Sequence, residues 1–97
     1  MNDKYILDDK NVVVSVNLET WAKWYETADR TVAKTNVNND VNVSTVFLGL
    51  DLSFGDGPPL LFETMIFGGE HDQYQERFET WEQAEAGHKV AVDLALT

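Results

Sequence analysis

The chain has 97 residues, which is the size of one small domain. Its 17 acidic and 7 basic residues give a formal net charge of −10, and 43% of its residues are hydrophobic, so the composition favours a folded acidic protein over a disordered chain. The sequence contains no cysteine, which excludes disulfides, thiolate metal sites and cysteine nucleophiles. The acidic excess argues against direct binding of nucleic acid, because a phosphate backbone is bound through lysine and arginine. No apolar run reaches the roughly 20 residues of a membrane span and no signal peptide opens the chain, so a cytoplasmic location is expected.

The charge is concentrated in the second half of the chain. Residues 1–50 carry seven acids and five bases, whereas residues 51–97 carry ten acids and two bases, a net charge of −8. One stretch holds six acids and a single base, Arg77. We expect it to project a negative field that favours either solvation or a cationic partner. Its acids are Glu70, Asp72, Glu76, Glu79, Glu82 and Glu85.

The N-terminal pattern predicts a hairpin followed by a helix. Two apolar runs, residues 4–7 and 11–16, flank a short polar turn. Asn17 then offers a helix N-cap. From Leu18 the apolar residues recur at helical spacing, with Trp24 at the border of the apolar face. That face is expected to hold Leu18, Trp21, Ala22, Tyr25 and Ala28, and the opposite face the acid–base pairs Glu19–Lys23 and Glu26–Arg30.

The middle of the chain predicts three strands. Residues 31–37 and 41–50 flank an Asn-rich turn, and residues 60–67 follow a loop that holds the two prolines. The second and third of these strands are apolar on both sides, which is typical of central strands. Because two helices suffice to cover only one face of the sheet, the second face is left for a partner or a second copy.

The C-terminal region predicts a short edge strand at residues 73–78 and a final helix. Thr80 is its expected N-cap, with Gln83 at the third helical position. The apolar face of this helix contains Trp81, Ala84, His88, Ala91, Val92 and Ala95. The element order is β-β-α-β-β-β-(β)-α, with short connections. We therefore expect one α+β domain over residues 1–97: a two-layer sandwich with a mainly antiparallel sheet of five to six strands and two helices on one face.

Two pieces of the sequence are specific, Glu-Thr-Ala-Asp-Arg at residues 26–30 and Phe-Glu-Thr-Met at residues 62–65. Together with several longer segments, they resemble small, uncharacterised proteins encoded by tailed bacteriophages and prophages. The resemblance implies a phage accessory protein that works in the bacterial host cytoplasm, and it assigns no activity or catalytic residue. The similar segments are residues 21–30, 43–51, 54–59, 61–69 and 80–88.

Polar residues that interrupt apolar patterns are the first candidate site residues. Glu63 and Thr64 lie inside an apolar strand, so one of them faces the interior, where a carboxylate needs a partner such as Arg30. For Glu63 an exposed side chain, a pair with Arg30 and a ligand-binding carboxylate remain open. His88 lies in the middle of an apolar helix face, where an imidazole is either packed, with one nitrogen bonded to a backbone carbonyl, or part of a pocket. His71 has no partner at metal-ligand spacing, so no metal site is predicted.

A loop and one tryptophan supply further candidates for binding. Residues 51–59 fit neither a calcium loop nor a dinucleotide fingerprint. The loop nevertheless begins at Asp51 and presents Phe54 next to Asp56, which suits a recognition element. Trp24, at the edge of its helix face, is a candidate partner contact, because aromatic anchors concentrate at interfaces.

The residue chemistry predicts a protein that is not an enzyme and has no cofactor, because no nucleophile can be placed beside a base. The leading hypothesis is a non-catalytic phage accessory protein that binds a host or defence protein through the acidic stretch. One alternative is capture of a nucleotide-like small molecule near Trp24, Arg30, Glu63, His88 and the loop of residues 51–59. A structural homo-oligomer, such as a homodimer, is the other alternative.

Overall fold

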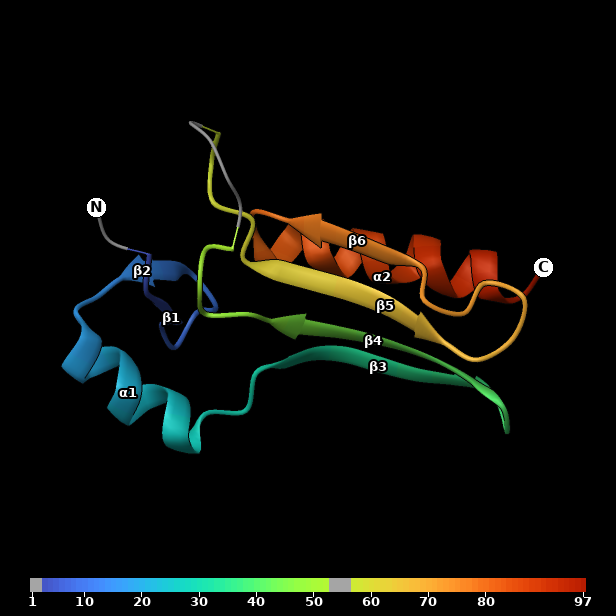
Figure 1. Cartoon of the computed structure of the whole chain (residues 1–97), viewed down its shortest axis with the longest axis horizontal. Coiled ribbons are helices and arrows are strands. Elements are labelled where there is room, and N and C mark those ends of the chain that lie inside the picture. The colour runs from blue at the N-terminus through green and yellow to red at the C-terminus, as the bar shows by residue number, and fades with distance from the viewer. Residues whose placement is uncertain (1–2, 53–56) are drawn as a thin grey trace.

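Six antiparallel strands and two helices make up the part of the chain that the computed structural model describes, residues 3–52 and 57–97 (Figure 1). The predicted α+β fold is confirmed, with the strands divided between a two-stranded sheet, β1–β2, and a four-stranded sheet in the order β3-β4-β5-β6. The elements are β1 (Tyr5–Leu7), β2 (Val13–Ser15), α1 (Leu18–Thr27), β3 (Thr31–Asn38), β4 (Val41–Phe47), β5 (Phe62–Phe67), β6 (Gln75–Phe78) and α2 (Trp81–Ala95).

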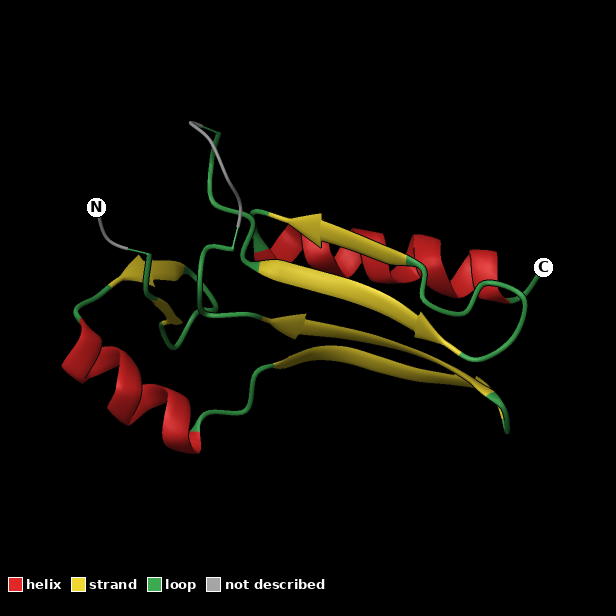
Figure 2. Cartoon of the chain, viewed as in Figure 1, coloured by secondary structure: helices red, strands yellow, loops and turns green. Residues whose placement is uncertain are grey.

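Helix α2 runs along one face of the four-stranded sheet and forms the second layer (Figure 2). The shortest dimension of the molecule is 19 Å. Thr80 caps this helix as predicted, since its side chain accepts a hydrogen bond from the Gln83 amide at 3.1 Å. The helix buries Ala84, His88 and Ala91 against the sheet, all on the predicted face.

Strict alternation along β4 and β5 separates the two faces of the sheet. Val43 lies opposite Ile66, and Phe47 opposite Phe62; all four side chains are fully buried under α2. The intervening residues point to the other face, which we call the outer face. There Val46, Met65 and Phe67 are only partly covered, and Phe67 is 40% exposed. Both central strands therefore carry apolar residues on two faces, as predicted, and α2 covers one of these faces.

The β1–β2 hairpin and α1 lie together at one end of the sheet (Figure 1). The hairpin turns at residues 8–10 as predicted, and its turn is held by the Asp8 carboxylate, which accepts the amides of Lys10 and Val12. Asn17 caps α1 through the Thr20 amide at 2.8 Å. Trp24 of α1 packs edge-on against Phe47 of β4, with ring centroids 5.6 Å apart. This contact joins α1 to the four-stranded sheet.

The packing face of α1 differs from the predicted one. Leu18 is 62% exposed, and the side chains that pack are Trp21, Trp24 and Tyr25. The helix ends at Thr27, so Arg30 lies beyond it and does not form the predicted pair with Glu26, whereas the predicted pair of Glu19 and Lys23 is present at 3.5 Å. An aromatic-rich helix with a short contact surface packs through its largest rings, which bury the most area per residue.

Strand β4 ends at Phe47, three residues earlier than predicted. Gly49 adopts φ +77°, a left-handed conformation that is unfavourable for other residues and ends the strand. A Cβ at this glycine would lie 2.9 Å from the Tyr25 ring, so the glycine also permits close approach of α1. The Trp21 indole donates to the Gly49 carbonyl at 3.0 Å. Helix α1 and the end of β4 therefore contact each other at Gly49, a position that only glycine occupies without strain.

Candidate binding surface

Two of the predicted site residues, Glu63 and His88, lie on opposite sides of the four-stranded sheet. Glu63 is on the outer face, where it accepts hydrogen bonds from Arg77 Nε at 3.0 Å and Gln75 Nε2 at 2.8 Å. The next residue, Thr64, points the other way and is fully buried beneath His88 and α2. The sheet itself separates the two side chains. They cannot belong to one small-molecule pocket, so the capture site expected from the sequence is not assembled as predicted.

His88 is the centre of a buried hydrogen-bonded chain. Its Nδ1 lies 2.7 Å from the Thr45 hydroxyl, which lies 2.6 Å from the Thr64 hydroxyl. On the other side of the ring, Nε2 lies 2.8 Å from the Thr35 hydroxyl. The two partners of His88 are therefore hydroxyls from β4 and β3, and not the backbone carbonyl that the sequence suggested; Thr64 extends the chain to β5. A neutral imidazole fits this arrangement, because one nitrogen donates, the other accepts, and each hydroxyl rotates to match.

Burial determines what this chain of polar groups can do. His88 is 6% exposed, and Thr45 and Thr64 are fully buried. Burial disfavours the charged imidazolium and lowers the pKa of His88. A hydroxyl beside an imidazole has the composition of a nucleophile and base, but a substrate has no access to groups packed between a sheet and a helix. The polar chain therefore stabilises the packing of α2 on β3, β4 and β5.

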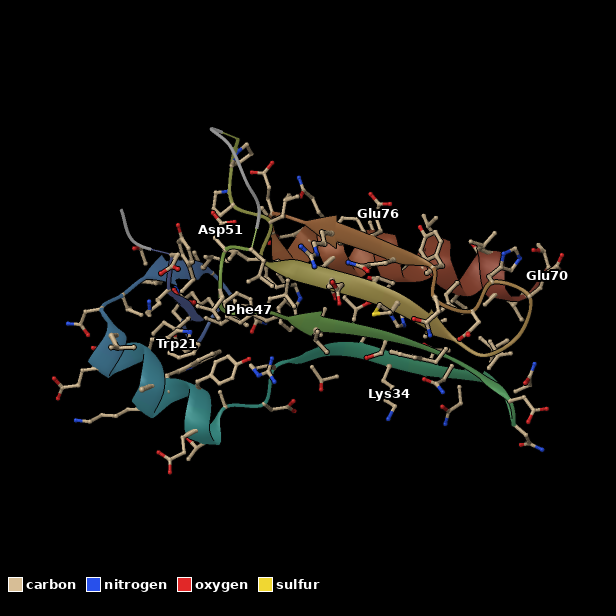
Figure 3. All side chains as sticks on the ribbon, viewed as in Figure 1. Trp21, Lys34, Phe47, Asp51, Glu70 and Glu76 are labelled. Atoms are coloured by element: carbon tan, nitrogen blue, oxygen red, sulfur yellow. The ribbon has the colours of Figure 1, made fainter. Side chains whose placement is uncertain are left out.

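The side chains of Arg30 and Trp24 are engaged at the junction between α1 and the sheet. The Arg30 guanidinium lies 4.3 Å from the centre of the Tyr25 ring and donates to the Phe47 carbonyl at 3.1 Å. Trp24 is half-buried against the Phe47 ring. Figure 3 shows Phe47 beside this junction. Arg30 therefore does not pair with Glu63. Instead, Arg30 and Trp24 hold α1 against the end of the sheet.

The predicted recognition loop is only partly described. Asp51 is half-buried, and its amide donates to the Asp3 carbonyl at 3.0 Å. Phe54 and Asp56, the two residues expected to make contacts from this loop, lie outside the described residues.

The six carboxylates between residues 70 and 85 are all exposed, and we call them the acidic surface. Glu70 and Asp72 lie in the β5–β6 connection, Glu76 lies on β6, and the remaining three lie at or near the start of α2. Figure 3 shows Glu70 at the β5–β6 end of the molecule and Glu76 along β6, with Lys34 at the opposite edge of the sheet. The six are therefore distributed over the β5–β6 connection, β6, the β6–α2 connection and the first turns of α2. The members of the acidic surface are Glu70, Asp72, Glu76, Glu79, Glu82 and Glu85.

Arg77, the one Arg or Lys within residues 70–85, does not pair with the acids of the acidic surface. Arg77 alternates to the outer face of the sheet, where it pairs with Glu63. Within residues 3–52 and 57–97, none of the six carboxylates takes part in an ion pair. Asp72 has a local role, because it accepts the Gly68 amide at 2.7 Å and holds the turn. The one Arg or Lys within residues 70–85 therefore pairs with a carboxylate outside the acidic surface.

One end of the acidic surface borders a cleft that sequence reasoning missed. The cleft has a volume of about 270 Å³ and lies between the turn of the β1–β2 hairpin and the first turn of α2. Nothing in the local pattern places these two segments side by side, since about 70 residues separate them. The lining residues are Asn11, Val12, Val13, Glu79, Thr80, Trp81 and Glu82.

Comparison of the chain with protein-family models, with curated proteins and with solved structures found no match. Across the described residues, no three His, Asp or Glu side chains converge as metal ligands. Neither of the two described helices has the length and apolar character that a membrane span requires. The residues themselves must therefore carry any functional argument.

Proposed function

We propose that this chain is a non-catalytic binding protein whose acidic surface occupies a basic site on another protein. The observation that carries the proposal is the pairing of Arg77 with Glu63, which leaves six exposed carboxylates with no ion pair among the described residues. Exposed charges of one sign attract and orient an oppositely charged partner over a distance of about 10 Å at 0.1 M salt.

The resemblance to phage-encoded proteins supplies the proposed context. In that context the partner is a host or defence protein in the bacterial cytoplasm, and its basic site is one that ordinarily meets nucleic-acid phosphates. A row of carboxylates offers such a site the same charge as a phosphate backbone, with no base to read. The protein then competes with nucleic acid by charge.

Affinity capture from a bacterial lysate tests the proposal with two variants of equal net charge. In the four-Gln variant, glutamines replace Glu76, Glu79, Glu82 and Glu85. The distant-acid control neutralises four exposed acids elsewhere: Glu19→Gln, Glu26→Gln, Asp40→Asn and Asp93→Asn. A partner retained by the wild type and the control but lost by the four-Gln variant supports the proposal. A partner lost equally by both variants, or retained by both, overturns it.

A second candidate function rests on the outer face of the sheet. Val46, Met65 and Phe67 line a shallow hollow of about 150 Å³ beside Ser44 and the pair of Glu63 and Arg77. An uncovered face with three apolar side chains favours association of two copies. In this alternative the chain is a structural homo-oligomer, and the acidic surface keeps the assembly soluble.

A further inference from the structure

The cleft beside the acidic surface combines an apolar wall with a negative rim. Val12 is 55% exposed along the hairpin turn, and Trp81 is half-buried on the α2 side. Glu79 and Glu82 also line the cleft, are exposed, and have no ion pair within the described part of the chain. An apolar surface next to two carboxylates matches a side chain with an apolar stem and a cationic end.

Both walls of the cleft are held by local hydrogen bonds. On the hairpin side the Asp8 carboxylate accepts the Val12 amide at 3.0 Å and the Lys10 amide at 2.8 Å, and these two bonds lower the pKa of Asp8. On the helix side the Glu79 amide donates to the Gln83 side chain at 3.0 Å. The Trp81 ring packs edge-on against the buried Phe62 ring, with the ring centroids 6.3 Å apart. A partner therefore meets a largely preformed surface.

We propose that this cleft receives an arginine side chain of the partner, a proposal that rests on the proposed function and specifies its contact. The volume of about 270 Å³ lies below the range of about 300–1,000 Å³ typical of drug-sized ligands, so one side chain suits it better than a nucleotide. Arginine fits better than lysine, because the planar guanidinium stacks on an aromatic ring and bridges two carboxylates.

The N-terminus of α2 could in principle bind an anion instead of a cation, but the charge of the neighbouring residues excludes this. A helix N-terminus attracts anions through its free amides and its dipole. Here the first turn carries Glu82, and Glu79 precedes the N-cap Thr80, so two full negative charges outweigh the partial positive charge of the helix end. An anion would meet both carboxylates, whereas a cation is attracted to both.

Nuclear magnetic resonance with two matched peptides tests the proposal. The first is acetyl-Gly-Arg-Gly-amide, and the second replaces arginine with citrulline, which is isosteric and uncharged. We expect the arginine peptide to shift the Trp81 indole resonance in a saturable manner at millimolar concentration, and the citrulline peptide to leave it unchanged. The three tryptophan indole signals are assigned with Trp81→Phe. Equal shifts with both peptides, or no shift at Trp81, overturn the proposal.

Three variants separate the cleft from general electrostatics. The double variant Glu79→Gln/Glu82→Gln is expected to lower the affinity for the arginine peptide about three- to tenfold. Val12→Ser keeps the charge and removes part of the apolar wall, so it also weakens binding. Glu70→Gln/Asp93→Asn loses the same charge far from the cleft and binds like the wild type. Equal weakening in the two charge variants, or unchanged binding in Val12→Ser, counts against the cleft.

The captured partner distinguishes failure of this proposal from failure of the proposed function. If Glu79→Gln/Glu82→Gln and Val12→Ser retain the partner while the four-Gln variant loses it, the acidic surface stands and the arginine cleft is wrong. If the four-Gln variant and its distant-acid control bind alike, the proposed function is wrong as well. Loss of the partner in Val12→Ser supports the cleft.

Discussion

Glu63 on β5 and Arg77 on β6 lie directly opposite each other in the sheet, and the Arg77 guanidinium donates to the Glu63 carboxylate at 3.0 Å. Their side chains are 16% and 30% exposed, so water screens the pair only in part. Register explains the pairing: on adjacent antiparallel strands, opposite residues share a face. This pairing also affects the acidic surface, because Arg77, which lies among its six acids in the sequence, points to the outer face of the sheet.

Removing either partner of this pair should destabilise the protein. Arg77→Gln leaves a half-buried Glu63 without its cation, and we expect the free energy of unfolding to fall by about 1 kcal/mol. Glu63→Gln removes the carboxylate that pairs with Arg77 and should lower the free energy of unfolding by a similar amount. Urea denaturation of both single variants and the double variant measures the coupling, which we expect to be about 0.5–1 kcal/mol. Additive effects in this cycle would show that the contact contributes nothing.

The buried position of His88 predicts a dependence of stability on pH. Because its pKa is lowered in the folded state, the unfolded chain binds a proton first as the pH falls. The histidine contribution is therefore complete above the unfolded pKa of about 6.5 and is lost below it, toward the folded pKa. Urea denaturation between about pH 5 and pH 8 should show this slope.

Two histidine variants isolate that slope from the titration of the carboxylates. His88→Gln should lose the part of the slope just below pH 6.5, at a cost in overall stability because the Thr35 and Thr45 hydroxyls lose a partner. His71→Gln, in the β5–β6 connection, is the matched control and should keep the slope. The same slope in both variants would contradict the assignment to His88.

Gly87 should be more costly to replace than its place in a helix suggests. A glycine-to-alanine change inside a helix ordinarily stabilises a protein by about 1 kcal/mol. Here a Cβ would overlap the ring of Phe78 on β6, so we expect Gly87→Ala to lower the free energy of unfolding by about 1–3 kcal/mol. Thermal unfolding measures the change. The double variant with Phe78→Leu should recover part of the loss, and a stabilised Gly87→Ala would refute the contact.

Local signals predicted the elements of this fold because each signal acts over a few residues. The caps at Asn17 and Thr80 are hydrogen bonds to amides three residues away, so the side chain that makes them is visible in the sequence. The alternation in β4 likewise follows from the geometry of one strand. The end of β4 was misplaced, because Gly49 ends the strand through its contact with α1, and that contact depends on distant residues.

The candidate site was harder to predict because it depends on which segments meet. Sequence correctly singled out Glu63 and His88 as unusual, but strand alternation places them on opposite faces of the sheet. Arg30 has the right charge for Glu63, yet the end of α1 at Thr27 sends it to Tyr25 and Phe47. Pairing between strands is a long-range property, and single residues carry no signal of it.

The outer face gives a prediction for the alternative of a homo-oligomer. If two copies associate through this face, Met65→Lys should convert a dimer to a monomer, because a charge would then be buried at the interface. Val90→Lys is the matched control, since Val90 is 60% exposed on α2, away from the outer face. Native mass spectrometry reads the mass of both variants. A wild-type chain that is monomeric at all concentrations rules out this alternative.

The salt dependence of binding tests the central claim most directly, that the acidic surface carries the interaction. The captured partner is titrated with the wild type, the four-Gln variant and the distant-acid control between about 0.1 M and 1 M salt, a range in which the Debye length falls from about 10 Å to about 3 Å. The account predicts that the wild type and the control weaken steeply with salt, and that the four-Gln variant binds weakly throughout. A wild-type affinity that is independent of salt, or a four-Gln variant that binds as tightly as the wild type, would contradict it.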